Sequence, residues 1–212
     1  MTIIRYGITG VLCQFESRID EETGKKVAAL TAAVDQSGLP GILERVPAYC
    51  SLMIRFDPRR MRYETLCDFL KEAEKKLDAA GQAKEPKIVE IPVHYGGEDG
   101  PDLSFVAEHA CLSEQEVVRI HSGKAYRIYM IGFLPGFPYL GGLDERLFTP
   151  RLSSPRTRIP AGSVGIGGQQ TGIYPMDSPG GWQLIGRTKI TLFDPSKPPL
   201  YQAGDLIRFV PV

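Results

Sequence analysis

Residues 149–188, TPRLSSPRTRIPAGSVGIGGQQTGIYPMDSPGGWQLIGRT, are the most informative stretch of this chain, and residues 132–142, GFLPGFPYLGG, share their composition. Both segments are dense in glycine and proline, and the longer one holds Trp182, the single tryptophan. Glycine lets the backbone approach other groups closely, and proline fixes φ and lowers the entropy lost on ordering. We therefore expect residues 149–188 to be a long functional loop that forms a rigid pocket or interface. Gly/Pro-rich hairpin turns of a β-barrel, which need no ligand, are the alternative.

The sequence around these segments is typical of a β-barrel. Short strand-like runs separated by Gly- and Pro-rich turns occupy residues 126–131, 189–193 and 206–210. Such regular short strands favour a closed or partly closed barrel. Ahead of them, two short helices are predicted over residues 102–110 and 114–120. The second begins with a capping box, because Ser113 is followed three residues later by Glu116.

Residues 1–82 are predicted to form a small α+β domain. Apolar side chains alternate along a strand at residues 11–15 and along two strands within residues 42–56. They recur at helical spacing over residues 27–34 and 66–77. The order strand–helix–strand–strand–helix is most of a ferredoxin-like fold.

The end of this domain is predicted from two features. The polar run AGQAKEPK at residues 80–87 has no apolar period, so it is the predicted linker. Residues 88–93 would be the closing strand of the ferredoxin-like sheet. A second domain would then span residues 88–212.

The composition of the chain and the spacing of its residues give no sign of nucleic-acid binding, membrane insertion, secretion or metal binding. Lys and Arg total 25, as do Asp and Glu, so no basic excess would attract nucleic acid or an anionic membrane. No run approaches the roughly 18 apolar residues of a membrane span, and the start MTIIRYGITG lacks the features of a secretory signal, so we expect a cytoplasmic protein. The four cysteines and three histidines show no metal-binding spacing, so we expect no metal site.

Several blocks of the sequence resemble one family. Besides the two Gly/Pro-rich segments, they are HYGGEDGPDL (residues 94–103), SEQEVVRIHSG (residues 113–123) and AGDLIRFVPV (residues 203–212). They are similar to the shared blocks of the family of allophanate hydrolase subunit 1, the sporulation-kinase inhibitor and the 5-oxoprolinase B subunit. The resemblance is strong over residues 88–212 and rests on the α+β order before them. It implies a cyclophilin-like β-barrel after a small α+β domain.

The resemblance also implies a function within a complex. It identifies the chain as the B subunit of an ATP-dependent 5-oxoprolinase, which converts 5-oxo-L-proline to L-glutamate with a C subunit (allophanate hydrolase subunit 2-like) and an A subunit (LamB/YcsF-like). The chain has no Walker motif, so the ATP site of the complex would lie on a partner or at a shared interface. We expect the isolated chain to be inactive. Inhibition of a sensor histidine kinase, and a role in an allophanate- or urea-carboxylase-type enzyme, are the alternatives.

Polar residues of the matching blocks are candidates for substrate binding. Arg156 would hold the substrate carboxylate, and its alternative is a surface ion pair. Gln169 would bond the lactam, and its alternative is a solvated turn residue. Tyr139 and Tyr174 would form walls of the pocket, although half-buried structural tyrosines are at least as common. The run GIGG, residues 165–168, would present N–H groups to an oxyanion or phosphate.

One catalytic pair is considered. Ser163 could act as a nucleophile if a base lay beside it, and His121 is the nearest candidate in the matching blocks. At the end of a helix, His121 alternatively interacts with the negative end of the helix dipole. Trp182 is expected to be a core or interface anchor rather than a platform on which a ligand stacks.

Overall fold

The structure is a computed structural model that describes residues 1–17, 20–77 and 86–212. Contacts between residues divide the chain into two compact units, Met1–Glu85 and Pro86–Val212. Each unit has a hydrophobic core of its own. Most of the predicted linker, residues 80–85, lies outside the described residues.

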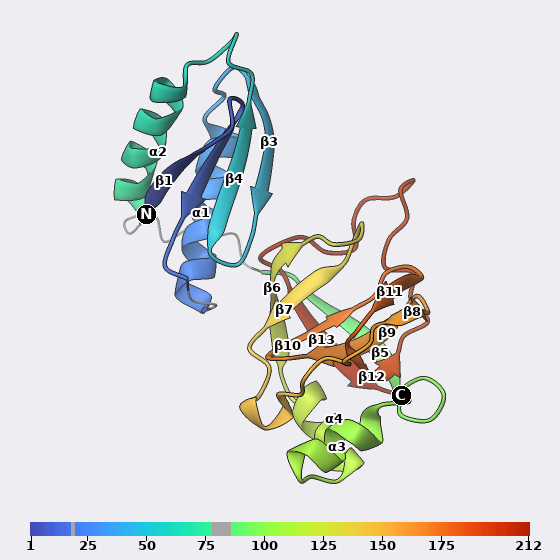
Figure 1. Cartoon of the computed structure of the whole chain (residues 1–212). Helices are drawn as coiled ribbons and strands as arrows, with labels where there is room; N and C mark the ends of the chain where they lie inside the picture. The colour runs from blue at the N-terminus through green and yellow to red at the C-terminus, as the bar shows by residue number, and fades with distance from the viewer. Residues whose placement is uncertain (18–19, 78–85) are drawn as a thin grey trace. The chain divides into compact units, whose positions relative to one another are not determined.

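The first unit is a four-stranded antiparallel sheet, in the order β1-β2-β4-β3, with two helices. Its elements are β1 (Thr2–Tyr6), β2 (Gly10–Gln14), α1 (Glu21–Gln36), β3 (Ile42–Pro47), β4 (Ser51–Phe56) and α2 (Tyr63–Leu77). Alternation along β2 and β4 turns Val11 and Ile54 toward Leu30 of α1 and Leu70 of α2, so both helices cover the same face (Figure 1). The strands and helices predicted from residue 11 to residue 77 are confirmed.

The predicted closing strand of this sheet is wrong. Residues 88–93 belong to β5 (Ile88–Tyr95), which pairs with β13 (Leu206–Pro211) and β12 (Gln183–Arg187) of the second unit. They do so because Ile91 and Val93 are buried inside the barrel. The edge beside β2 is instead taken by β1. Four of its five residues are exposed, so no apolar alternation marks β1 in the sequence.

The second unit contains a closed barrel with the strand order β10-β7-β6-β13-β5-β12-β9, and a separate two-stranded sheet of β11 and β8. β5 and β13 run parallel, whereas the other neighbours in the barrel run antiparallel. The elements not yet given are α3 (Leu103–Ala110), α4 (Glu114–Ser122), β6 (Ala125–Ile131), β7 (Pro138–Gly141), η1 (Glu145–Leu147), β8 (Arg156–Ile159), β9 (Ser163–Gly167), β10 (Gln170–Ile173) and β11 (Ser178–Gly180). The expected barrel is therefore present and closed.

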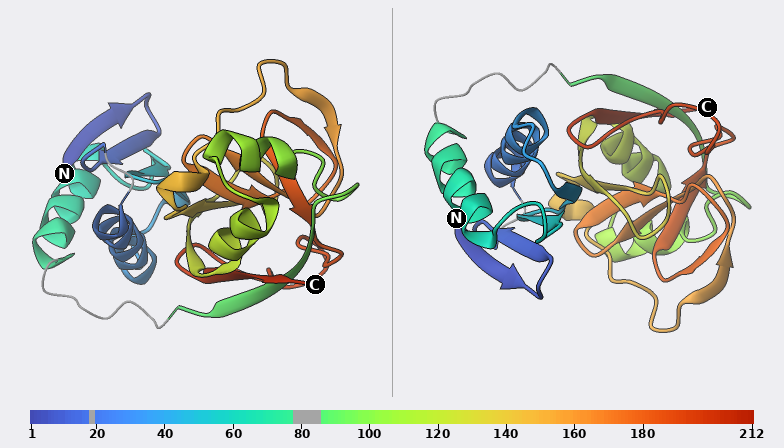
Figure 2. Two further views of the ribbon diagram at one scale, coloured as in Figure 1. Left: turned by 90° about the horizontal axis from the view of Figure 1, so that it is seen from below. Right: turned by 90° about the horizontal axis from the view of Figure 1, so that it is seen from above.

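Helices α3 and α4 lie together at one end of the barrel (Figures 1 and 2). The capping box predicted for α4 is confirmed, because the Ser113 Oγ accepts from the Glu116 N–H at 3.3 Å and the Glu116 carboxylate accepts from the Ser113 N–H at 2.9 Å. Val106 and Val117 turn into the barrel core, where they meet residues such as Phe209. The two helices thus cover one end of the core of this unit.

Two expectations for the glycine-rich part are wrong. Residues 149–188 are not a long loop, because they contain five strands, β8 to β12. The sequence hides them, since β9 reads Ser-Val-Gly-Ile-Gly and is buried at every position. Residues 189–193, predicted as a strand, form irregular structure. The apolar alternation there arises because Leu192 is buried in the barrel core and Ile190 packs against it.

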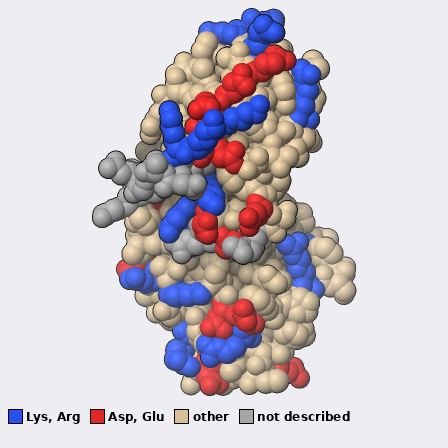
Figure 3. Space-filling view, turned by 90° about the vertical axis from the view of Figure 1, so that its left-hand side faces the viewer, with Lys and Arg blue, Asp and Glu red and all other residues tan. Residues whose placement is uncertain are grey.

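Charged side chains of both signs are interspersed on the face drawn in Figure 3, where blue and red groups lie beside one another. Charged side chains of the described residues form ion pairs, such as Lys75 with Glu72 on α2 at 2.6 Å. Among the helices of the described residues, none is long and apolar enough to cross a membrane.

Candidate functional site

Trp182 packs directly on the backbone of strands β9 and β10. A Cβ atom at Gly167 would lie 2.5 Å from the indole, and one at Gly172 would lie 3.1 Å from it. Gly165, the strand partner of Gly172, would place a Cβ 3.2 Å from the Trp182 Cβ. A side chain at Gly167 would displace the indole, which is 5% exposed, and one at Gly165 or Gly172 would press on Trp182 more mildly. The glycines that indicated a backbone-lined pocket thus make room for Trp182.

The run at residues 165–168 is part of the barrel sheet. β9 has a neighbouring strand on each side, β10 and β12, and the Gly168 N–H donates to the Thr149 carbonyl at 2.7 Å. Gly168, with φ +64°, and Gln169 form the tight turn between β9 and β10. Gln169 is exposed. The amides of this run bond within the sheet, and Gln169 is a turn residue.

Trp182 belongs to an aromatic cluster with Phe137, Tyr139 and Tyr174. The Phe137 ring centroid lies 5.7 Å from that of Trp182, 5.2 Å from that of Tyr174 and 4.9 Å from that of Tyr139. Burial raises the pKa of Tyr174 to about 12, and it also raises the pKa of the half-buried Tyr139. Both hydroxyls are therefore protonated at neutral pH. The two tyrosines predicted to form walls of the site lie together in this cluster.

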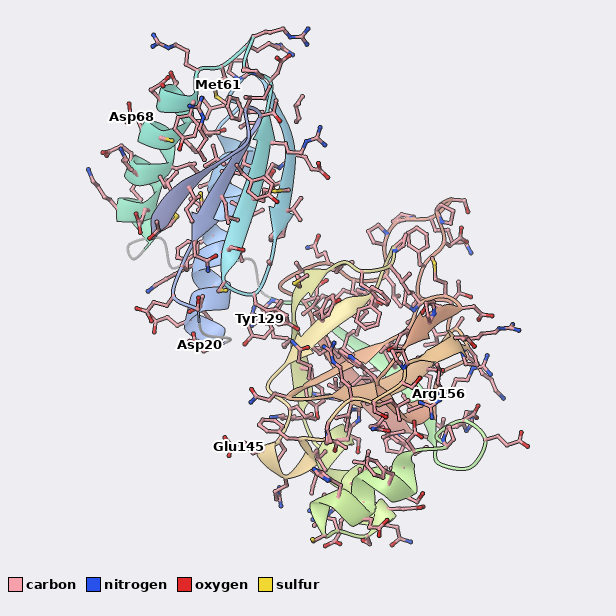
Figure 4. The ribbon with its side chains drawn as sticks, in the orientation of Figure 1. Asp20, Met61, Asp68, Tyr129, Glu145 and Arg156 are labelled. Atoms are coloured by element: carbon pink, nitrogen blue, oxygen red, sulfur yellow. The ribbon has the colours of Figure 1, made fainter. Side chains whose placement is uncertain are left out.

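Arg156, which Figure 4 labels on the barrel unit, is held by two acceptors. Its Nη2 donates to the Asp102 carboxylate at 2.7 Å, and its Nη1 donates to the Trp182 carbonyl at 3.3 Å. The other Asp102 oxygen accepts from the Leu184 N–H at 2.6 Å. The pair is partly shielded, since the Arg156 side chain is 30% exposed and that of Asp102 is 13% exposed. It connects the start of α3 to β8 and β12.

Arg151 lies on the outer side of the same cluster. Its side chain is exposed, and its guanidinium carbon lies 5.8 Å from the centroid of the Trp182 ring. Its positive charge opposes the effect of burial on the pKa of both Tyr139 and Tyr174. Within the described residues, no carboxylate forms an ion pair with Arg151.

His121 is completely buried and uses both ring nitrogens. Its Nε2 lies 2.8 Å from the Thr171 hydroxyl, and its Nδ1 lies 2.8 Å from the Tyr95 hydroxyl. Because the Thr171 hydroxyl donates to the Gly165 carbonyl at 3.0 Å, we infer that it accepts from Nε2–H and that Nδ1 accepts from Tyr95. Burial lowers the pKa of His121 to about 3, so the ring is neutral. It stacks on Phe209, with ring centroids 4.5 Å apart.

Ser163, the predicted partner of His121, bonds elsewhere. It is 2% exposed, and its hydroxyl donates to the Pro160 carbonyl at 2.8 Å. Each member of the predicted catalytic pair is thus buried and has partners other than the other member. Over residues 1–17, 20–77 and 86–212, no group of three or more His, Cys, Asp or Glu side chains is gathered to hold a metal ion.

Known proteins are similar to this chain in sequence and in fold. The family model of the carboxyltransferase domain, subdomain C and D, matches residues 1–202. The chain belongs to this family. The 5-oxoprolinase B subunit of Bacillus subtilis (strain 168) is 43% identical over 220 aligned residues, which cover 98% of this chain and 91% of that protein. The 5-oxoprolinase B subunit of Haemophilus influenzae is 49% identical over 170 residues, which cover 79% of this chain and 76% of that protein. The resemblance inferred from the sequence blocks is confirmed.

Solved structures extend the carboxyltransferase family match to the fold. The crystal structure of TTHA0988 superposes with a TM-score of 0.84 and 39% sequence identity, covering 97% of this chain and 40% of that chain. The present chain therefore spans about 40% of the length of TTHA0988. A putative urea carboxylase and two urea amidolyases match at 26% to 28% identity.

Arg151 and Asp102 were not predicted from the sequence. Arg151 is one of three arginines in the run PRLSSPRTR, and their spacing does not tell which of them has an acidic partner. Asp102 directly precedes α3, where an aspartate is ordinarily a capping residue. Its side chain makes no capping bond here, because both of its oxygens bind Arg156 and the Leu184 N–H. Only the fold brings these residues together.

Proposed function

We propose that this chain is the B subunit of an ATP-dependent 5-oxoprolinase and acts in the opening of 5-oxo-L-proline to L-glutamate. The observation that carries this proposal is the nearly end-to-end match to the 5-oxoprolinase B subunit of Bacillus subtilis, over 98% of this chain and 91% of that protein. A match of this extent includes both units. The match to urea carboxylase and amidolyase sequences supports a shared fold and a more distant relationship.

The reaction explains why ATP is consumed. The lactam of 5-oxoproline is an unstrained amide that water attacks slowly at neutral pH. Transfer of a phosphoryl group from ATP to the lactam oxygen makes the ring carbon electrophilic. Water then adds to that carbon and the ring C–N bond breaks, which leaves an acyl phosphate. A second water adds to the acyl carbon, and phosphate leaves with the oxygen that carried it. The products are glutamate, ADP and phosphate, and the site must stabilise negative charge as it develops.

The ATP site is proposed to lie on a partner chain or at an interface with one. A phosphate cradle needs several free backbone N–H groups pointing at one place. The one glycine run that resembled such a cradle, residues 165–168, bonds within the barrel sheet and packs against Trp182. It does not fit a triphosphate. The contribution proposed for this chain is recognition of the lactam beside Tyr139 and Tyr174.

The proposed partners are the C subunit, which is allophanate hydrolase subunit 2-like, and the A subunit, which is LamB/YcsF-like. A requirement for partners is supported by the family description, which covers only subdomains C and D of a carboxyltransferase domain. The finer fold assignment is a cyclophilin-like barrel after a ferredoxin-like unit. The strand order β1-β2-β4-β3 supports it, because β1 takes the edge that the last strand of a ferredoxin-like sheet would take.

The direct test is glutamate release from 5-oxoproline and ATP. Three mixtures are compared: this chain alone, the A and C subunits without it, and all three together. The proposal predicts glutamate only in the complete mixture. If folded partners form no glutamate with this chain, the proposal fails. Stoichiometric suppression of histidine-kinase autophosphorylation would then favour the kinase-inhibitor alternative, and turnover of a urea derivative would favour the urea-carboxylase type.

A further inference from the structure

Both terminal nitrogens of the Arg156 guanidinium already donate hydrogen bonds within the protein. It binds Asp102 and the Trp182 carbonyl, and the Asp102 carboxylate is held in turn by the Leu184 N–H. A substrate carboxylate could displace Asp102 only by leaving that charge partly buried and without its cation, which is costly. Arg156 and Asp102 together therefore link β8, β12 and the start of α3.

Arg151, by contrast, has an exposed guanidinium on an anchored backbone. The residues on either side of it are tied to the two neighbours of Trp182. The Leu152 N–H donates to the Gly181 carbonyl at 2.7 Å, and the Gln183 side chain donates to the Pro150 carbonyl at 2.9 Å. The backbone that carries Arg151 is therefore fixed relative to the indole.

We propose that Arg151 binds the carboxylate of the lactam substrate beside Trp182 and Tyr139, and that Arg156 is a positioning residue for Trp182. This inference rests on the proposed function. A guanidinium binds a carboxylate through two parallel hydrogen bonds, which a single ammonium cannot do. The flat ring of a lactam suits the adjoining aromatic walls. The ligand class is thus a small cyclic amide that carries a carboxylate.

The test uses the complete enzyme, reconstituted from this chain and its two partner subunits. KM and kcat for 5-oxoproline are compared between the wild type and the variants Arg151→Ala, Arg151→Lys, Arg156→Ala and Arg158→Ala. Arg158 is the matched control, because it is an exposed arginine of the same segment whose partner is Asp177 at 2.7 Å. Urea unfolding of each variant chain, followed by Trp182 fluorescence, separates binding from stability.

Arg151→Ala is expected to raise KM about ten- to a hundredfold, the cost of losing charged hydrogen bonds. Its kcat should stay within about threefold and its unfolding midpoint should be unchanged. Arg151→Lys should lie between Arg151→Ala and the wild type, because the charge is kept and the fork is lost. Arg156→Ala should instead lower the unfolding midpoint and change kcat together with KM, and Arg158→Ala should match the wild type.

Two outcomes would overturn the inference while leaving the proposed function standing. In one, the wild-type complex is active and the KM of Arg151→Ala stays within about twofold of it. In the other, Arg158→Ala raises KM as much as Arg151→Ala, which would indicate a general effect of surface charge. A wild-type complex that forms no glutamate would overturn the proposed function, and this inference with it.

Discussion

The neutral, buried His121 should make the barrel unit less stable in mild acid. The histidine pKa is about 6.5 in an unfolded chain, and burial lowers it to about 3 in the folded protein. Between these values the unfolded chain binds a proton that the folded chain does not. The free energy of unfolding is therefore at its full value above pH 6.5 and falls as pH falls toward 3, by about 1.4 kcal/mol for each pH unit. From pH 7 to pH 5 the loss is about 2 kcal/mol.

Urea unfolding followed by Trp182 fluorescence measures this loss in the unit that contains His121. The comparison variant is His121→Gln, whose amide can donate to Thr171 and accept from Tyr95 but does not titrate. Carboxylates with a lowered pKa, such as that of Asp177 beside the Ala161 N–H and Arg158, lose their stabilising effect only below about pH 5. The range from pH 5 to pH 7 therefore isolates the histidine.

The wild type is expected to lose about 2 kcal/mol over this range, and His121→Gln is expected to lose little. His121→Gln will start from a lower stability, because an amide does not fill the space of the stacked imidazole. The slope, and not the starting value, is the result that matters. An equal loss in both proteins would refute the assignment of a neutral buried ring.

Three further changes test the packing around Trp182 and the second unit, all measured as the free energy of unfolding in urea. Gly167→Ala should lower the free energy of unfolding by about 1–3 kcal/mol and shift the Trp182 emission, because its Cβ would lie 2.5 Å from the indole. The control Gly181→Ala, whose Cβ would have its nearest neighbour 3.7 Å away, should stay within about 0.5 kcal/mol of the wild type. Equal effects of the two changes would contradict the packing account. Asp102→Ala should cost about 2–3 kcal/mol through the loss of two charged hydrogen bonds; an unchanged midpoint would show that its ion pair contributes nothing. Ser113→Ala should cost about 0.5–2 kcal/mol, since it removes the capping box of α4, and no loss would mean that water replaces the cap.

Elements with a complete local signal were predictable from the sequence. The apolar stripe of α2, the alternation along β4 and the capping box at Ser113 each depend on residues close in the chain, and each is found in the structure. The sequence signals fail for strands in which buried and exposed residues do not alternate. Strand β1 lies at an edge and is mostly exposed, and β9 is buried on every residue while containing two glycines. Neither shows the alternation by which strands are recognised.

The candidate site was predictable in composition but not in pairing. The Gly/Pro-rich segments do supply the aromatic cluster, and Tyr139 and Tyr174 do lie in it. The sequence could not tell that Arg156 forms an ion pair with Asp102, which lies more than fifty residues away in the chain. That pairing depends on the closure of the barrel. Which arginine of this segment has no carboxylate partner among the described residues is thus a property of the fold, and Arg151 could be found only there.

The most direct test of the central claim is a titration of this chain into fixed amounts of the A and C subunits with ATP and 5-oxoproline. If the chain is the B subunit, glutamate and ADP formation should start near zero, rise in proportion to the chain added, and level off once the partners are saturated. Glutamate formation by the A and C subunits alone, at a rate that the added chain does not change, would contradict the claim.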